Sequence, residues 1–202
     1  MKTLLSNNFC NNCLILFISL FIIFLNLDSS SKVKPFDSVD ELHKSLEKIS
    51  NKKINSESFT LMLHTVKKTY DSEKMSKMIL GNFWRKIDVK EKNKFIKVFE
   101  EYIVIKYLRQ FSKIKQFTFE HSKIEEIGKK YRLASVLLKV GEDKPIKISY
   151  LLNLKDKQWK IFDVLIEGSI SEIATKKSEF SQILNNEGIS GLMSEITEKN
   201  KF

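Results

Sequence analysis

The chain has 202 residues, with 35 lysines and arginines against 25 acidic residues and a formal net charge of +10. Only Arg85, Arg109 and Arg132 are arginines, and arginine is the usual residue for bidentate recognition of phosphates and bases. The lysines are scattered along the chain instead of forming one basic run, so we exclude nucleic acid as a partner. The charge fits either a solvated lysine-rich surface or long-range attraction to anionic headgroups and acidic partners.

The first 31 residues have the pattern of a secretory signal. Lys2 precedes an apolar run over Leu14–Leu25, and Ser29 and Ser31 are small residues where a signal peptidase could cut. The run is shorter than the roughly 20 residues that a membrane-spanning helix needs. We therefore predict a cleaved signal peptide over residues 1–31, with an uncleaved N-terminal anchor as the alternative.

The two cysteines, Cys10 and Cys13, lie at or before the start of this apolar run, so we interpret them as incidental. The remaining chain has no cysteine and must fold without a disulfide. Residues 32–202 are long enough for one domain with its own core.

Helical periodicity dominates from about residue 36 to residue 112. Apolar residues at helical spacing predict a first helix around Val39–Ile49, and Asn55 and Ser56 are candidate caps for a second. A short third helix ends near Gly81. The pair Asp88 and Glu91 has capping-box spacing and opens the longest helix, which has a wide apolar stripe.

From about residue 113 onward the pattern changes to strands and closing helices. Period-two alternation around residues 117–119 is followed by three longer strands and short polar turns, at Tyr131–Val140, Ile146–Leu154 and Gln158–Ile166. Ser171 can cap a helix over about 172–185, Gly188 can end it, and a last short helix follows from about Ser190 to about residue 199. The predicted fold is α+β, with a curved four-stranded antiparallel sheet.

Two of these strands are apolar on both faces. In the first, Val136, Leu138 and Val140 alternate with Leu133 and Leu137. An antiparallel sheet with one solvated face should instead alternate between apolar and polar residues. Both faces therefore need a cover, which can be protein alone or a cavity that holds acyl chains.

Two blocks of sequence carry a resemblance to a known family. One is QWKIFDVLIEG at Gln158–Gly168, followed by Phe180, Gly188-Ile189 and Gly191-Leu192; the other is Leu80-Gly81-x-Phe83-Trp84-Arg85, followed by Phe95, Phe99 and Tyr107. Together they resemble the periplasmic phospholipid carriers of the MlaC or toluene-tolerance type, over residues 70–196. Gly168-Ser169-Ile170-Ser171 departs slightly from the Gly-Val-Ser that is commoner in the family.

The resemblance implies a cone-like fold that encloses lipid tails. It implies a monomeric periplasmic carrier with no cofactor, whose cargo is a phospholipid. Its partners would be the lipid-binding subunit of an inner-membrane ABC transporter and an outer-membrane lipoprotein–porin complex. We expect the cavity to be lined by Phe95, Phe99, Tyr102, Val136, Leu138, Ile148, Tyr150, Leu152, Phe162 and Val164. Reversing the strand faces would exchange half of this set.

Asp163 interrupts an otherwise apolar strand, where an unpaired carboxylate would be costly. It can accept hydrogen bonds from a helix terminus, from Arg85 or from a lysine, it can act as the general base of a small isomerase, or it can contact a headgroup or a partner. The resemblance favours a structural role, as it does for the other motif residues, Gly81, Trp84, Glu167 and Gly168.

The three histidines, His43, His64 and His121, are isolated, and no metal-ligand or phosphate-loop spacing is evident. We expect a carrier and not an enzyme. The alternatives are a carrier of another amphiphile such as a hopanoid, the isomerase that uses Asp163, and a membrane-anchored scaffold.

Overall fold

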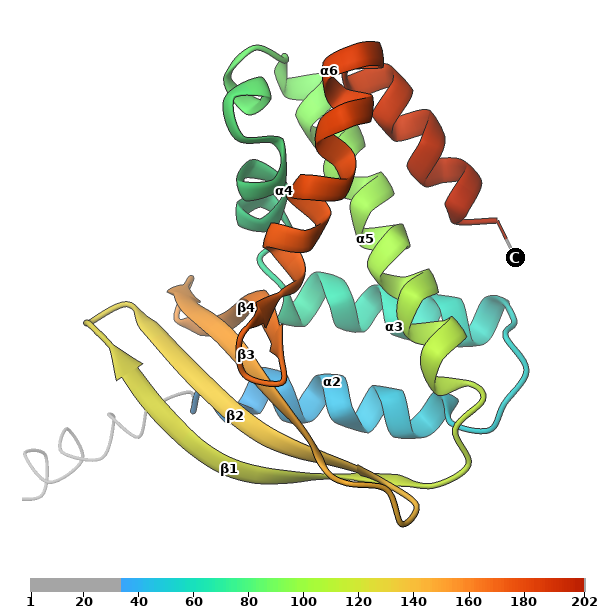
Figure 1. Ribbon diagram of the computed structural model, residues 1–202, viewed down its shortest axis with the longest axis vertical. Coiled ribbons are helices and arrows are strands. Elements are labelled where there is room, and N and C mark those ends of the chain that lie inside the picture. Colours follow the sequence, from blue (N-terminus) through green and yellow to red (C-terminus); the bar gives the residue numbers. More distant parts are fainter. Residues whose placement is uncertain (1–33, 202) are drawn as a thin grey trace, which may run out of the picture. The chain divides into compact units, whose positions relative to one another are not determined.

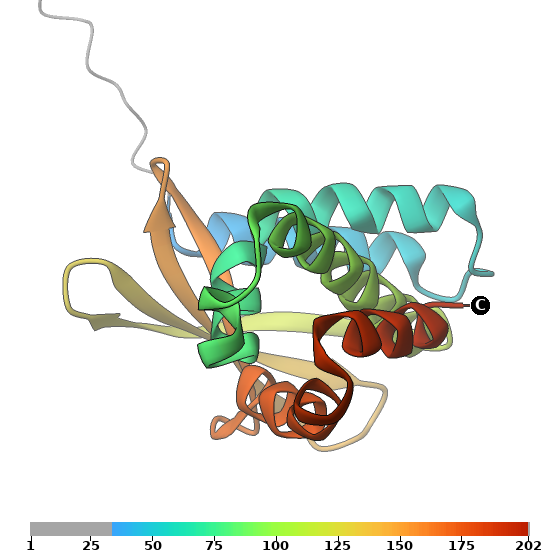
Figure 2. The ribbon, with the colours of Figure 1, turned by 90° about the horizontal axis from the view of Figure 1, so that it is seen from above.

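Helices form the first part of the computed structural model, which describes residues 34–201. The elements before the sheet are α2 (Phe36–Ile49), α3 (Ser56–Thr69), α4 (Ser72–Leu80), the 3-10 turn η2 (Gly81–Arg85) and α5 (Val89–Phe111). Helix α5 lies between α3 and α6, the C-terminal helix (Glu172–Lys199), and packs against both (Figures 1 and 2). The predicted signal peptide lies outside the described residues.

Capping side chains set the starts of the helices where the sequence predicts them. Asn55 accepts a hydrogen bond from the Ser58 amide at 2.8 Å and opens α3. Asp88 accepts one from the Glu91 amide at 2.7 Å, and the Glu91 carboxylate accepts one from the Asp88 amide at 3.1 Å. Each such cap stabilises its helix by about 1 kcal/mol.

The sheet has five antiparallel strands in chain order. They are β1 (Phe117–Ile127), β2 (Tyr131–Val140), β3 (Ile146–Lys155), β4 (Gln158–Ile166) and β5 (Ile170–Ser171). The predicted number of four strands is wrong. After β4 the chain turns at Glu167 and Gly168, both at positive φ (51° and 78°), and returns along β4 for two residue pairs. A strand of two residues is too short to leave an alternating pattern in the sequence.

A bulge in β4 changes which of its side chains share a face. Tyr150 is paired with Val164 and Leu152 with Ile161, so Phe162 stands outside the alternating pairs. Ile161 and Val164 therefore point to the same side of the sheet, although three positions separate them. We call this side the inner face.

Helix α2 packs across the inner face. The His43 ring stacks on Phe119 of β1 at a centroid distance of 3.5 Å and is hydrogen-bonded to Tyr150 of β3. Figure 1 shows β1 and β2 running past α2. The core joins this contact to α3 and α5, and its largest completely buried side chains include Phe95 and Leu108.

Helix α6 is broken at Gly188, where the backbone leaves helical geometry (φ 67°, ψ −166°). The two parts run in different directions (Figure 1). The break matches the predicted end of one helix at Gly188 and the start of another near Ser190. Just after it, a Cβ atom on Gly191 would lie 2.3 Å from the Glu187 Cβ, so only glycine fits this close approach.

Candidate functional site

A cavity of about 560 Å³ lies between the inner face of the sheet and helix α5. The start of α6 closes one side of it. Its volume falls in the range of roughly 300–1,000 Å³ that small-molecule sites occupy. Its apolar lining includes Phe99, Ile103 and Phe111 of α5, Leu138, Val140, Ile146, Ile148, Val164 and Ile166 of the sheet, and Leu46, Met75, Ile114 and Ile173. We refer to it as the cavity.

Six of the ten side chains predicted to line a lipid site do line this cavity: Phe99, Tyr102, Leu138, Ile148, Tyr150 and Val164. They come from α5 and three different strands, and the fold brings them together. Whether they contact a lipid stays a prediction.

The other four predicted residues lie outside the cavity lining. Phe95 is completely buried and stacks behind Phe99 at a centroid distance of 6.0 Å. Val136 and Leu152 are also completely buried, Val136 two residues before the lining residue Leu138 and Leu152 two residues after the lining residue Tyr150. Phe162 is displaced by the bulge, and its ring lies 3.5 Å from the Lys74 ammonium, away from the cavity.

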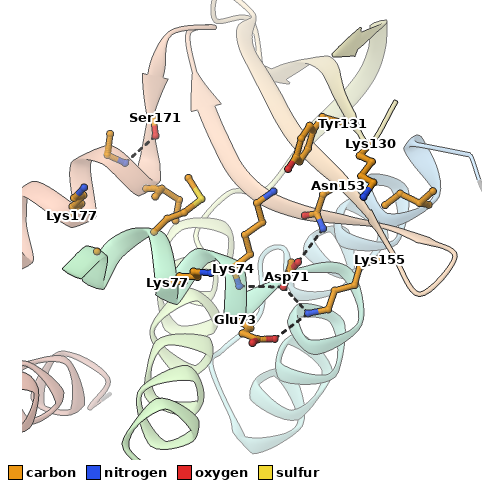
Figure 3. A pocket seen from close by; sticks show the side chains of 15 residues that line it. Asp71, Glu73, Lys74, Lys77, Lys130, Tyr131, Asn153, Lys155, Ser171 and Lys177 are labelled. Carbon is orange, nitrogen blue, oxygen red and sulfur yellow. Dashed lines mark hydrogen bonds and ion pairs between the residues drawn. The ribbon is translucent and has the colours of Figure 1, made fainter. Parts of the chain in front are cut away.

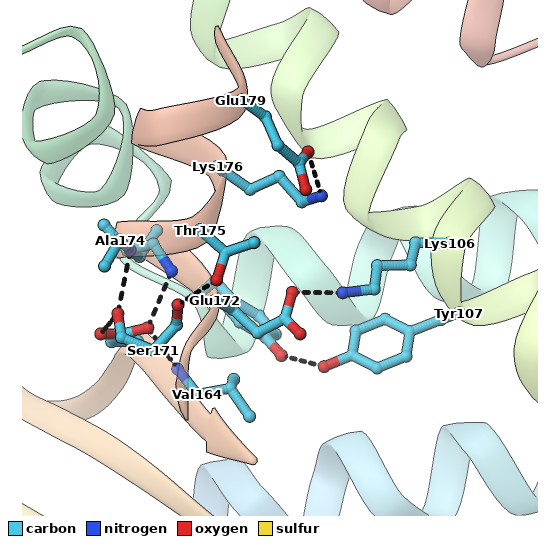
Figure 4. A network of polar contacts seen from close by, with 12 residues as sticks. Lys106, Tyr107, Val164, Ser171, Glu172, Ala174, Thr175, Lys176 and Glu179 are labelled. Atoms are coloured by element: carbon cyan, nitrogen blue, oxygen red, sulfur yellow. Dashed lines mark hydrogen bonds and ion pairs between the residues drawn. The ribbon is translucent and has the colours of Figure 1, made fainter. Parts of the chain in front are cut away.

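Polar side chains that the sequence analysis missed form the rim of the cavity. Lys106 of α5 is paired with Glu172, the first residue of α6, and Lys176 is paired with Glu179 at 2.6 Å (Figure 4). Burial alone would lower the pKa of Lys176, but hydrogen bonds to Glu179 and Tyr102 raise it. Lys176 is therefore charged, and each of the two lysines has its own carboxylate partner.

Besides Tyr102, three further tyrosines line the cavity. Tyr70, at the end of α3, is hydrogen-bonded to Tyr107 of α5, and Tyr150 is bonded to the His43 Nε2 at 2.9 Å. Burial raises the pKa of Tyr107 to about 12 and holds those of Tyr70 and Tyr150 well above the ordinary value. Burial, together with the charge of His121, lowers the pKa of His43 to about 3. All four groups are therefore neutral near pH 7.

Sequence offered only partial signals for this polar lining. Tyr107 belongs to the second family block, but its position there says nothing about a partner. Tyr70 ends α3 in extended geometry, and 37 residues separate it from Tyr107. Only the packing of α3 against α5 brings the two hydroxyls together.

Asp163 faces the N-terminus of α6. Its carboxylate accepts hydrogen bonds from the amides of Val164 (2.8 Å) and Ile173 (3.1 Å) and from the Ser171 hydroxyl (2.6 Å). Of the partners considered from the sequence, a helix terminus is the one it has, and Arg85 instead contacts Asn82. The positive end of the helix dipole stabilises this buried carboxylate, which in turn holds α6 against β4.

A second hollow, of about 850 Å³, lies beside α4 (Figure 3). We call it the α4 groove. Its lysines are Lys74, Lys77, Lys130, Lys155 and Lys177. At its base Asp71 accepts hydrogen bonds from Asn153 and Lys155, each at 3.0 Å. Burial favours a raised pKa for Asp71, but these hydrogen bonds outweigh it and hold the pKa below the ordinary value.

Within residues 34–201, no cluster of histidine, cysteine and carboxylate side chains is arranged to bind a metal ion. Nor does any helix in this part of the chain have the length and apolar character needed to cross a membrane.

Comparison with known proteins agrees with the two sequence blocks. The profile of the family described as MlaC protein matches residues 37–198. No curated protein matches the chain. Among solved structures, the chain is similar to the phospholipid-binding protein from Ralstonia solanacearum in complex with a phospholipid, with a TM-score of 0.72 and 15% identity over 83% of this chain and 97% of that one. The likeness confirms the α+β fold with a curved antiparallel sheet.

Proposed function

The chain belongs to the MlaC protein family, and on that premise we propose that it binds a phospholipid by its acyl chains and carries it between membranes. The observation that carries the proposal is the cavity, which has an apolar interior and a charged rim on the side of α6. The Ralstonia protein of the same fold was solved with a phospholipid.

Burial of the acyl chains supplies the binding free energy. Each methylene group removed from water contributes roughly 0.8 kcal/mol. A few hydrogen bonds of about 1 kcal/mol each could not hold an acyl chain out of a bilayer. The paired charges of Lys106–Glu172 and Lys176–Glu179 would keep the polar headgroup at the rim and the chains inside.

Membership of the family supports a proposal for the route of the cargo. We propose that residues 1–31 direct the protein to the periplasm. There it would exchange lipid with the lipid-binding subunit of an inner-membrane ABC transporter and with an outer-membrane lipoprotein–porin complex. It would use no nucleotide itself, so the direction of transfer would depend on relative affinities and on ATP hydrolysed by the transporter.

No observation favours the isomerase alternative. Asp163, the base that it would use, is not among the cavity-lining residues, and its carboxylate already accepts three hydrogen bonds. Among the described residues, no observation specifically favours a hopanoid as the cargo or a membrane-anchored scaffold as the function.

Native mass spectrometry with lipid extraction tests the proposal. The full chain is expressed with its own leader and purified from a bacterial periplasm. We expect one phospholipid per protein molecule. A folded protein that carries no lipid, and takes none up from vesicles, would contradict the carrier function.

A further inference from the structure

The hydroxyl groups of Tyr70 and Tyr107 are hydrogen-bonded to each other, and one of their two hydroxyl hydrogens has no acceptor within the pair. A tyrosine hydroxyl has one hydrogen to donate and can also accept. When two hydroxyls are bonded to each other, one hydrogen lies between the oxygens and the other needs an acceptor elsewhere. Within residues 34–201, no protein group accepts that second hydrogen.

The pair is placed where cargo can supply the acceptor. Both tyrosines line the cavity, and Tyr70 is only 4% exposed. A buried donor without an acceptor costs about 1–3 kcal/mol, so a cargo oxygen at this point would be favoured over a methylene group. Burial raises the pKa of both hydroxyls, which keeps them protonated as donors over the physiological range.

The surroundings of the pair favour a neutral acceptor. The lysines that line the cavity, Lys106 and Lys176, are already paired with Glu172 and Glu179. A phosphate or a free carboxylate brought to the pair would lose its hydration without an unpaired positive charge to replace it, which costs free energy. An ester carbonyl has a strong acceptor oxygen and no net charge, and in a diacyl lipid it joins each acyl chain to the headgroup region.

We propose that the Tyr70–Tyr107 pair donates a hydrogen bond to an ester carbonyl of the cargo, so that the cavity selects acyl esters over ether-linked or purely hydrocarbon chains. This inference rests on the proposed function and adds a class of chemical group that the cavity recognises. The apolar wall accounts for affinity to any alkyl chain, whereas the hydroxyl pair accounts for discrimination between linkages.

A competition experiment tests the proposal. The delipidated full-length protein is incubated with an equimolar mixture of diacyl and dialkyl-ether phosphatidylcholine of equal chain length, and the bound lipids are quantified by native mass spectrometry. The two lipids differ at the ester carbonyls and share the headgroup. We expect the wild type to prefer the diacyl lipid by about five- to tenfold, the effect of one well-placed hydrogen bond.

The double variant Tyr70→Phe/Tyr107→Phe removes both hydroxyls and keeps the rings. We expect its preference to fall to about one. The matched variant Tyr131→Phe removes a tyrosine hydroxyl outside the cavity, from the α4 groove, and should keep the wild-type preference. A preference that survives in the double variant would overturn the proposal.

A second measurement needs no variant. With lipid labelled by ¹³C at the ester carbonyls, the infrared carbonyl band of the bound lipid should move to lower frequency than in a non-polar solvent. Equal binding of the two lipids by the wild type, or an unshifted band, would contradict the proposed recognition of the ester and would leave the carrier function intact. Failure of both lipids to bind would contradict the proposed function itself.

Discussion

The cavity and the α4 groove are two hollows of one chain, with volumes of about 560 and 850 Å³. The larger one is the poorer candidate for a lipid tail. Its wall has five lysines as well as the carboxylates of Asp71 and Glu73, and it is more open to solvent than the cavity. Volume alone therefore does not identify the site.

The two hollows differ in where their polar side chains lie and in whether those side chains are charged. In the cavity the charges are confined to the rim and the interior polar groups are neutral hydroxyls. In the α4 groove a charged network forms the base, with Lys155 contacting both Asp71 and Glu73. An alkyl chain placed there would remove water from charges without replacing its hydrogen bonds, which costs free energy.

The largest effect that we expect is on lipid content. Leu138→Glu places a carboxylate on the apolar wall of the cavity and should abolish lipid co-purification, since the charge must stay solvated or be neutralised. Lys77→Glu makes a larger charge change in the α4 groove and should leave the bound lipid unchanged.

Bound lipid is measured by extraction from equal amounts of protein. Ile124→Glu on β1 is a matched control, because this residue is 40% exposed and lies outside the cavity lining. If a folded Leu138→Glu protein still carried lipid, the cavity would be the wrong site.

The second expected effect is on the pH dependence of stability, through His43, the hydrogen-bond partner of the cavity-lining Tyr150. The pKa of His43 is lowered by burial from 6.5 to about 3, so between these values the unfolded state binds a proton that the folded state does not. The free energy of unfolding should therefore fall on acidification by about 1.4 kcal/mol per pH unit in this window. His43→Gln should flatten the slope in urea titrations. The exposed His64→Gln serves as control, and an unchanged slope in His43→Gln would refute this assignment.

The third effect is on the attachment of α6 to β4. Asp163→Ala leaves the amides of Val164 and Ile173 without their acceptor and should lower the free energy of unfolding by about 2–4 kcal/mol. Ser171→Ala removes one hydroxyl from the same network and should cost about 1 kcal/mol. Thermal unfolding compares the two variants. Equal losses would mean that the carboxylate does not hold the helix.

Local features made much of the fold predictable from the sequence. Asn55, Asp88 and Ser171 mark helix starts because a cap acts within three residues of itself. Gly188 marks the break in α6 because its backbone geometry favours glycine. The three long strands were predictable because polar turns separate them.

Features that depend on a distant partner were not predictable. The bulge at Phe162 exists only in relation to β3, so simple alternation assigned Phe162 to the same face as Val164. Val136 and Leu138 lie on the same face of β2, yet the packing of the helices makes Val136 completely buried core and leaves Leu138 in the cavity wall. Neither fact is contained in one strand's own pattern.

The smallest effect belongs to the α4 groove. Hydrogen bonds hold the pKa of Asp71 below its ordinary value of 3.8, so its contribution to stability is present above that value and is lost as the pH falls through the lowered one. Lys155 is 40% exposed, so solvent screens the pair, and Asp71→Asn should cost only about 1 kcal/mol at pH 7.

Urea titrations of Asp71→Asn and wild type at pH 7 and in strong acid should converge at the acid end, while lipid content stays at the wild-type level throughout. Loss of lipid from this variant would show that the α4 groove takes part in cargo binding, and the contrast between the two hollows would no longer hold. Retained lipid with the expected acid dependence would assign the charged network to the stability of the α4 region and leave the cavity as the cargo site.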